Sequence, residues 1–429
     1  MSLRVTLTVA TVLVVGCGNA PSGSSDGSAR DATARRLDAT ASARDASAPD
    51  ASGPDATASI PDATASIPDA SEADAGTSAS APFAPNEVSI LYPLDPDHML
   101  RPADQGAYGA LVPRALIDRA APLTFSASAD QVYARLRVVA MRLDPCSKIS
   151  PRAPCRAELR LVLQPVLSFP TGMTSDDAAL HAIYGIPFDD LRATLAAIHA
   201  LADPALLAER RLMVHPTLER EGLTGPYAAG IRAAILAVAG ATRLERLTFM
   251  QVMEPANFWT FGGFDRSPSG QYAPTAIPGF RDSIQRLSNN VSTDELRIVV
   301  TPSVIDGDDL TPLYDSSRVP AMSRAARLVT LGAALRIESP LRHSAATVDC
   351  VRCHLAAVVR RWTVRTQGDD LSQHADLYRS GAMDLTAPET IAPPLALKTF
   401  RAFGWIGDQP AISPRVVNET AAVLEQLDP

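Results

Sequence analysis

The residues with the most specific chemistry in this sequence are Cys350, Cys353 and His354, in the run Cys350-Val351-Arg352-Cys353-His354. This C-x-x-C-H spacing is the pattern by which c-type haem is attached to proteins. Two thiols three residues apart at the start of a helical turn point to one side, where each can add to a porphyrin vinyl group and form a thioether. The histidine that follows can bind the iron. The run therefore predicts covalently bound haem c with His354 as the proximal iron ligand.

Other chemistries of two closely spaced cysteines compete with haem attachment. A zinc site needs about four ligands, and the sequence has no second C-x-x-C run and no H-x3-H run, which disfavours zinc. A redox-active pair of the thioredoxin kind follows a strand in a βαβ unit, whereas residues 344–349 have the composition of a polar turn. A disulfide between Cys350 and Cys353 remains the alternative.

Residues 350–429 resemble a small monohaem cytochrome c domain. The order of features is that of the family: the haem motif, a loop region that contains a methionine, and a final helix, here residues 416–427. The resemblance implies thioethers at Cys350 and Cys353 and axial ligation of the iron by His354. It also implies a role in electron transfer.

The ligand on the other side of the iron is Met383 if the family pattern holds, because it is the only methionine after the motif. Met383 follows His354 at a shorter distance than is usual in the family. His374 is the second candidate and His343 the third. A five-coordinate iron with an open position is the remaining alternative.

Residues 1–17 have the features of an export signal. One basic residue, Arg4, precedes an apolar run from Val5 to Val15, which is too short for the roughly 20 residues of a spanning helix. The run ends in Val-Val-Gly-Cys, which resembles a bacterial lipobox and predicts acylation of Cys17. An ordinary signal peptide is the alternative. We expect an exported protein that is lipid-anchored to the bacterial membrane, at the outer membrane or the periplasmic face.

Residues 18–85 have the composition of a disordered tether. They consist almost entirely of Ala, Ser, Thr, Asp, Pro and Gly, and residues 55–61 are repeated as residues 62–68. So little bulky apolar surface cannot offset the entropy of ordering. A flexible chain of this length spans roughly 45 Å. Such a tether is similar to those of surface lipoproteins in myxobacteria.

Residues 86–319 have a globular composition, and two of their cysteines predict a disulfide. Strand-like runs at 136–143 and 157–166 are joined by a proline-rich loop with Cys146 and Cys155 at its ends. This pattern indicates a hairpin closed by a bridge, as is common in exported proteins. The five cysteines are then accounted for by lipid, bridge and haem.

Apolar periodicity and proline positions predict the remaining elements. Further strands are expected at 88–91, 244–254, 258–264 and 296–300. Helices are expected at 176–184, 188–201, 204–212, 226–238, 322–336 and 416–427. The chain is therefore predicted to have an α+β fold: a mixed α/β middle domain with a largely antiparallel sheet over residues 86–319, followed by a mostly α-helical, cytochrome c-like segment over residues 320–429.

The function expected from these features is haem binding and electron transfer with an unidentified redox partner. The alternative is a surface binding or structural lipoprotein in which Cys350 and Cys353 form only a disulfide. The net charge of −8 and the lack of basic clusters argue against nucleic acid as a partner. His181, His199 and His215 are predicted to be structural or surface residues. An electron carrier is favoured over an enzyme.

Cys17 is expected to carry two acyl chains and to be the first residue of the mature protein, since it follows the lipobox-like run directly. Mass spectrometry of the N-terminal peptide from the membrane fraction checks this prediction. A soluble mature protein with an unmodified N-terminus would contradict it.

Overall fold

The computed structural model describes residues 83–120, 128–147, 154–175, 177–203, 209–253, 258–289, 295–303, 307–383, 385, 400 and 402–427. The predicted signal peptide, lipobox cysteine and residues 18–82 of the predicted tether lie outside the described residues. The tether was predicted to extend to residue 85, but Ala84 and Pro85 are buried and a helix begins at Pro85, so this boundary is wrong. Residues 77–429 form one compact unit. None of the helices in the part of the chain that the structure describes has the length and apolar character needed to cross a bilayer.

A sheet of ten strands runs through this unit, and every pairing in it is antiparallel. The strand order is β1-β4-β5-β7-β8-β9-β11-β12, with β6 beside β5 and β10 beside β9. The strands are β1 (Ser89–Leu91), β4 (Leu136–Ser147), β5 (Arg156–Phe169), β6 (Gly172–Ser175), β7 (Ala179–Gly185), β8 (Leu244–Met253), β9 (Phe258–Arg266), β10 (Tyr272–Pro274), β11 (Ile284–Asn289) and β12 (Ile298–Thr301). Two small hairpins stand apart from the sheet: β2 (Gln105–Gly106) with β3 (Gly109–Ala110), and β13 (Phe403–Ile406) with β14 (Gln409–Ile412).

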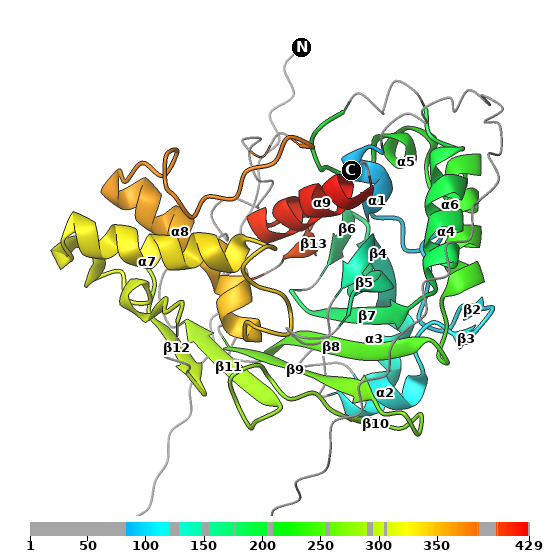
Figure 1. Ribbon diagram of the computed structural model, residues 1–429. Coiled ribbons are helices and arrows are strands. Elements are labelled where there is room, and N and C mark those ends of the chain that lie inside the picture. The colour runs from blue at the N-terminus through cyan, green and yellow to red at the C-terminus, as the bar shows by residue number, and fades with distance from the viewer. Residues whose placement is uncertain are drawn as a thin grey trace, which may run out of the picture. The chain divides into compact units, whose positions relative to one another are not determined.

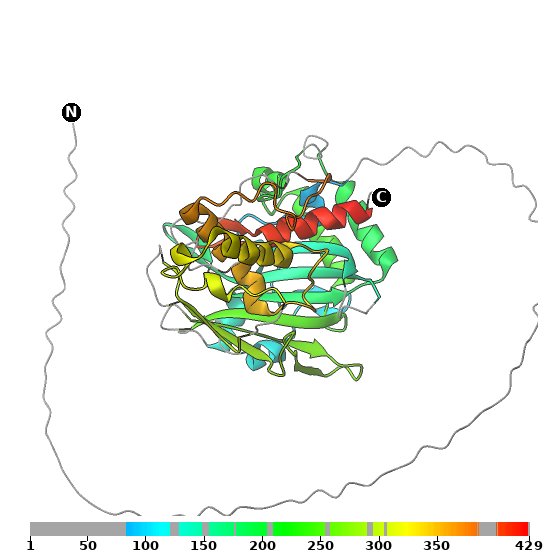
Figure 2. The same ribbon diagram turned by 60° about the vertical axis from the view of Figure 1, so that its left-hand side comes forward.

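Figure 1 shows the helices of the described residues at several places around the sheet: α4, α5 and α6 lie together at one end, α7 and α8 lie at the other, and α2 and α3 lie in the lower part of the view. Helices α4 and α6 pack against each other, and α7 packs against α8 and α9. Their bounds are α1 (Pro85–Val88), α2 (Arg114–Arg119), α3 (Ala129–Arg135), α4 (Phe188–His199), α5 (Pro216–Glu221), α6 (Pro226–Val238), α7 (Arg324–Glu338), α8 (Cys350–Gln367) and α9 (Pro414–Leu427), with 3-10 turns at Thr311–Leu313 and Val319–Ala321. In Figure 2, α9 lies across the sheet at strand β4, which it contacts.

Two hydrophobic cores stabilise the unit, one at each end of the sheet. The first joins strands β4, β5 and β7 to α4, α6 and α9. The second joins strands β9, β11 and β12 to α7 and α8. An antiparallel sheet presents alternate side chains to its two faces. The strands between the two cores can therefore bury leucines on one face, while the side chains of the other face line a cavity between the sheet and the helices.

The predicted fold class is wrong, because residues 320–429 do not form a helical cytochrome c-like segment behind a separate middle domain. Helix α9 packs on α1 and β4, and β13 packs on β4, β5 and β6. Trp405 in β13 exchanges two hydrogen bonds with Gln164 in β5, at 2.7 and 2.8 Å. The amphipathic pattern of residues 416–427 predicted a helix but could not identify its partner, which lies more than 250 residues earlier in the chain.

Most individual elements were predicted with the correct type. The helices at 188–201, 226–238, 322–336 and 416–427 are present as α4, α6, α7 and α9. The helix predicted at 176–184 is wrong, because Ala179–Gly185 is strand β7. Apolar residues occupy this short run at both strand and helix spacing, so periodicity alone could not decide between the two. Of the helix predicted at 204–212, residues 204–208 lie outside the described residues, and 209–212 are not helical.

The predicted disulfide joins Cys146 in β4 to Cys155, which lies just before β5. The two Cα atoms are 4.4 Å apart, within the range for a bridge. The paired strands bring the two cysteines together, so the bridge closes the end of the β4–β5 hairpin.

Replacing Cys146 and Cys155 together by alanine is expected to lower the free energy of unfolding by about 2–3 kcal/mol, because the unfolded chain loses the constraint of the closed loop. Denaturant unfolding of both proteins under oxidising conditions measures the difference. In a reducing buffer the two proteins should unfold alike. Equal stability without reductant would show that the bridge does not form.

Candidate functional site

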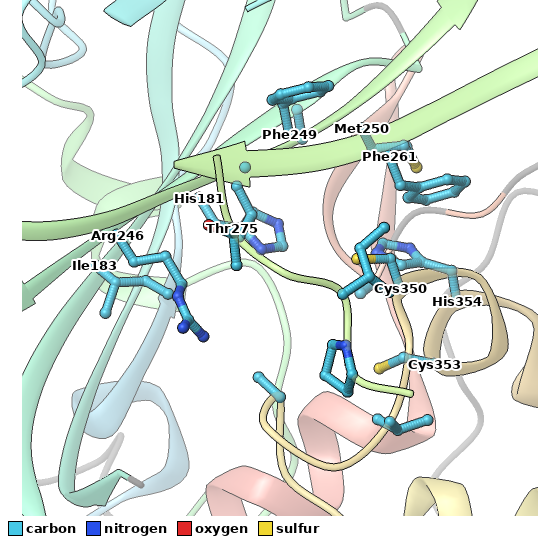
Figure 3. A pocket seen from close by; sticks show the side chains of 18 of the residues that line it. His181, Ile183, Arg246, Phe249, Met250, Phe261, Thr275, Cys350, Cys353 and His354 are labelled. Atoms are coloured by element: carbon cyan, nitrogen blue, oxygen red, sulfur yellow. The ribbon is translucent and has the colours of Figure 1, made fainter. Parts of the chain in front are cut away.

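The three residues of the C-x-x-C-H run lie on one face of helix α8. The helix begins at Cys350, and residues three and four positions apart are neighbours on a helix surface. Cys350, Cys353 and His354 therefore project together, and all three line the same cavity, as Figure 3 shows. The helical geometry therefore places two thiols and one imidazole on the same side of α8.

The two residues between the cysteines hold the helix in place. Val351 is fully buried in the second core, as is Leu355 one turn later. Arg352 donates a hydrogen bond from Nη1 to the backbone carbonyl of Asp308 at 3.2 Å. The motif face cannot rotate away from the cavity without exposing these apolar side chains to water.

A buried polar pair fixes the first turn of α8. Asp349 caps the helix and accepts a hydrogen bond from the Arg352 backbone N–H at 3.0 Å. Gln285 in β11 donates to the same carboxylate at 2.8 Å and accepts from the Val351 backbone N–H at 3.0 Å. These bonds satisfy N–H groups that have no partner within the helix. The start of the motif is thereby tied to the sheet.

The imidazole of His354 is oriented by a backbone carbonyl. Its Nδ1 is hydrogen bonded to the carbonyl oxygen of Phe400, which can only accept, so Nδ1 carries the proton. Nε2 is then the basic nitrogen, which is the arrangement in which histidine binds a metal. The ring of Phe261 in β9 packs beside it, with ring centroids 5.2 Å apart.

The cavity that these residues line has a volume of about 430 Å³, within the range of roughly 300–1,000 Å³ typical of cofactor and ligand sites. Strands β5, β7, β8 and β9 form one wall, and helices α8 and α9 form the other. Figure 3 shows His181, Ile183 and Arg246 on the sheet side and Cys350, Cys353 and His354 on the helix side. The cavity therefore lies between parts of the chain that are far apart in sequence.

Cross-strand pairing arranges the sheet wall in three rows of residues that line the cavity. The phenylalanine row, which is nearest His354, consists of Ala179, Met250 and Phe261. The histidine row follows two residues further along each strand and consists of Val162, His181, Thr248 and Gly263. The arginine row comes next and consists of Arg142, Arg160, Ile183 and Arg246.

Buried charges gather where the arginine row meets α9. Glu419 in α9 contacts Arg142 and accepts a hydrogen bond from Arg415 Nε at 2.7 Å. Burial by itself raises the pKa of this carboxyl, but the charges of Arg142, Arg415 and Arg160 together outweigh it, so the pKa of Glu419 lies well below its usual value. The carboxylate is ionised at neutral pH and holds α9 on strand β4.

The two motif cysteines are free thiols in the structure, in contrast to Cys146 and Cys155. Each thiol is accessible from the cavity but otherwise enclosed by protein. This enclosure raises the pKa of Cys350 to about 12 and also raises the pKa of Cys353. A redox-active C-x-x-C pair needs a lowered thiol pKa, so the surroundings of these thiols do not favour disulfide-exchange chemistry.

The three predicted candidates for the second iron ligand do not line the cavity. Met383 is buried in the first core. His374 donates from Nε2 to the carbonyl of Leu328 at 3.3 Å. His343 pairs through Nε2 with Asp308 at 2.8 Å. The structure thus brings together Cys350, Cys353 and His354 but not the residues expected on the far side of the iron.

His181 is the residue that sequence analysis missed, because residues 176–184 were assigned to a helix. In a strand, Ala179, His181 and Ile183 share one face, and that face lines the cavity. Reading the segment with period two would have placed this histidine with the apolar residues of a buried surface. The prediction that His199 and His215 are structural fits their contacts with Glu87 and Tyr227.

Comparison with protein-family models, with curated proteins and with solved structures finds no match to this chain. In the described part of the chain, no three residues among His, Cys, Asp and Glu are grouped as a protein-only metal site. The candidate site must therefore be interpreted from its own geometry and chemistry.

Replacing Glu419 by glutamine is expected to destabilise the protein by roughly 3 kcal/mol, because Arg142 and Arg415 lose their shared counter-charge in a buried place. The wild-type carboxylate has a lowered folded-state pKa, so its stabilisation is complete above about pH 4.3 and is lost as the pH falls below that value. The difference between the two proteins should therefore shrink in acid. Denaturant unfolding at neutral and acidic pH measures it.

The matched control is Glu425→Gln, which removes an exposed carboxylate from the same helix and is expected to cost less than about 1 kcal/mol. Equal losses for the two variants, or a Glu419→Gln loss that does not depend on pH, would contradict the assigned role of Glu419.

Proposed function

We propose that the protein binds haem c covalently through Cys350 and Cys353, with His354 as an axial iron ligand, and that it carries electrons outside the cytoplasm. The observation that carries this proposal is the shared cavity: all three motif residues line it, and the Phe400 carbonyl fixes the imidazole tautomer that binds metal. The proposal concerns the site alone, since the fold is not the helical one that the sequence resemblance implies.

The residues around the cavity fit an amphipathic group of this kind. The phenylalanine row supplies apolar surface beside the motif, as the macrocycle requires. Arg142, Arg160 and Arg415 line the cavity as well. Arg142 and Arg415 are paired with Glu419, and Arg160 is paired with Glu158, but a guanidinium group has five N–H donors and can also bind carboxylates such as those that haem carries. When bound, the iron of the group supplies a reversible one-electron change.

The protein contributes attachment, orientation and exclusion of water. Two thioether bonds from Cys350 and Cys353 hold the group to α8. The hydrogen bond that Gln285 donates to Asp349 and the one that it accepts from the Val351 backbone N–H fix the first turn of that helix. The carbonyl of Phe400 directs His354 and increases its basicity. Apolar side chains around the cavity keep water from the macrocycle.

Export remains part of the proposal, and the disulfide supports it. A bridge such as Cys146–Cys155 persists in oxidising compartments and is rare in the cytoplasm. Cys17 is the proposed point of attachment to the membrane. In the alternative function, a structural lipoprotein with a Cys350–Cys353 disulfide leaves the cavity without a role, and a binding lipoprotein with that disulfide leaves the orientation of His354 unexplained.

The full chain, exported in a host that attaches haem c, is expected to retain haem on a denaturing gel, because thioether bonds survive denaturation. Cys350→Ala combined with Cys353→Ala should abolish the haem stain. The matched control is Cys146→Ala combined with Cys155→Ala, which should lower stability but keep the stain. Absence of haem from the folded, exported wild-type protein would favour the alternative.

A further inference from the structure

We infer that His181 is the second axial ligand of the haem iron. This inference rests on the proposed attachment of haem at Cys350 and Cys353, and it assigns a role to a residue that sequence analysis placed in a helix. It also replaces the downstream candidates, since Met383, His374 and His343 do not line the cavity.

Outside the motif, three side chains among the described residues that line the cavity have atoms able to bind iron: His181, Met250 and Glu419. Glu419 is committed to the ion network with Arg142 and Arg415, and withdrawing it would leave two buried guanidinium groups without their shared counter-charge. The choice is therefore between an imidazole and a thioether.

Met250 lies on the same side of the site as His354. It is the cross-strand partner of Phe261, whose ring packs against the imidazole of His354 with centroids 5.2 Å apart. It is also buried in the second core with Trp259 and Phe261. Met250 is thus a neighbour of the residue that packs against the His354 ring and belongs to the row nearest His354. A macrocycle bound by His354 would have Met250 close to its proximal side, so Met250 is poorly placed to reach the opposite face of the iron.

His181 belongs to the histidine row, which lies next to the phenylalanine row on the sheet wall of the cavity. Two residues along a strand correspond to roughly 7 Å, which separates the histidine row from the row that contacts His354. The neighbours of His181 in its row are Val162 and Thr248, and Thr275 donates its backbone N–H to the carbonyl of Gly263 in the same row at 2.9 Å. His181 comes from the sheet wall, while His354 comes from the helix wall. The macrocycle attached to α8 would be bounded by one imidazole on each side.

Ligation by two imidazoles has a functional consequence. Thioether ligation raises the reduction potential of haem relative to bis-histidine ligation, and an empty sixth position permits reaction with small molecules. With His181 bound, the iron has no open position and the site serves electron transfer at a lower potential than a histidine–methionine site.

The test uses the exported full-length holoprotein and its absorption and electron paramagnetic resonance spectra. The wild type is expected to be low-spin, to lack the weak long-wavelength band of methionine ligation and not to bind carbon monoxide in the reduced state. His181→Gly should keep the haem stain, become high-spin and bind carbon monoxide. Added imidazole should restore the low-spin spectrum of His181→Gly, which a merely structural role for His181 does not explain.

Two further variants keep the inference open to refutation. His181→Met should retain a sixth ligand of a different kind and gain the methionine band, which provides a readout even if the glycine variant does not fold. Met250→Leu is the matched control and should leave the spectrum unchanged. An unchanged spectrum in His181→Gly, or loss of the low-spin state in Met250→Leu, would overturn the inference. Absence of haem from every variant and from the wild type would instead refute the proposed function.

Discussion

The cavity depends on a buried ion network that holds α9 against the sheet. Glu419 is shared by Arg142 of β4 and Arg415 of α9 itself. Arg415 also donates to the backbone carbonyls of Ile337 and His343, at 2.7 and 2.8 Å. These bonds tie α9 to the end of α7 and to the segment that leads into α8. One arginine thus sets the relative positions of three helices, and the space between them and the sheet becomes the candidate site.

Local patterns in the sequence predicted that the three motif residues project to one side of a helix, but they did not predict what surrounds these residues. The spacing of Cys350, Cys353 and His354 is a property of five consecutive residues, and the helix that orients them begins at the first of these. The carbonyl of Phe400 lies 46 residues away, and Gln285 lies 64 residues from Asp349. No pattern within one element encodes contacts of this kind, because they arise only when the sheet and helices pack.

The error over His181 and the error over the fold class have a common physical origin. Both the 179–185 segment and the 416–427 segment show apolar residues at regular spacing, and periodicity reports a buried face without naming what buries it. For β7 the helix period was the wrong choice, so His181 was assigned to a helix surface and not to the strand face that lines the cavity. For α9 the helix period was correct, but it did not predict that the helix packs on β4 and α1. The C-x-x-C-H pattern can therefore be found in the sequence, while the fold around it cannot be predicted from that pattern.

The two cysteine pairs of the described chain reach different states for reasons visible in the fold. Cys146 and Cys155 sit at the end of paired strands with Cα atoms 4.4 Å apart, so formation of the hairpin brings their sulfur atoms together. Cys350 and Cys353 lie on one turn of a helix whose first residues are held by Asp349 and Gln285, and their side chains face a cavity rather than each other. The first pair is therefore joined by a bridge, whereas the second pair consists of free thiols that line the cavity.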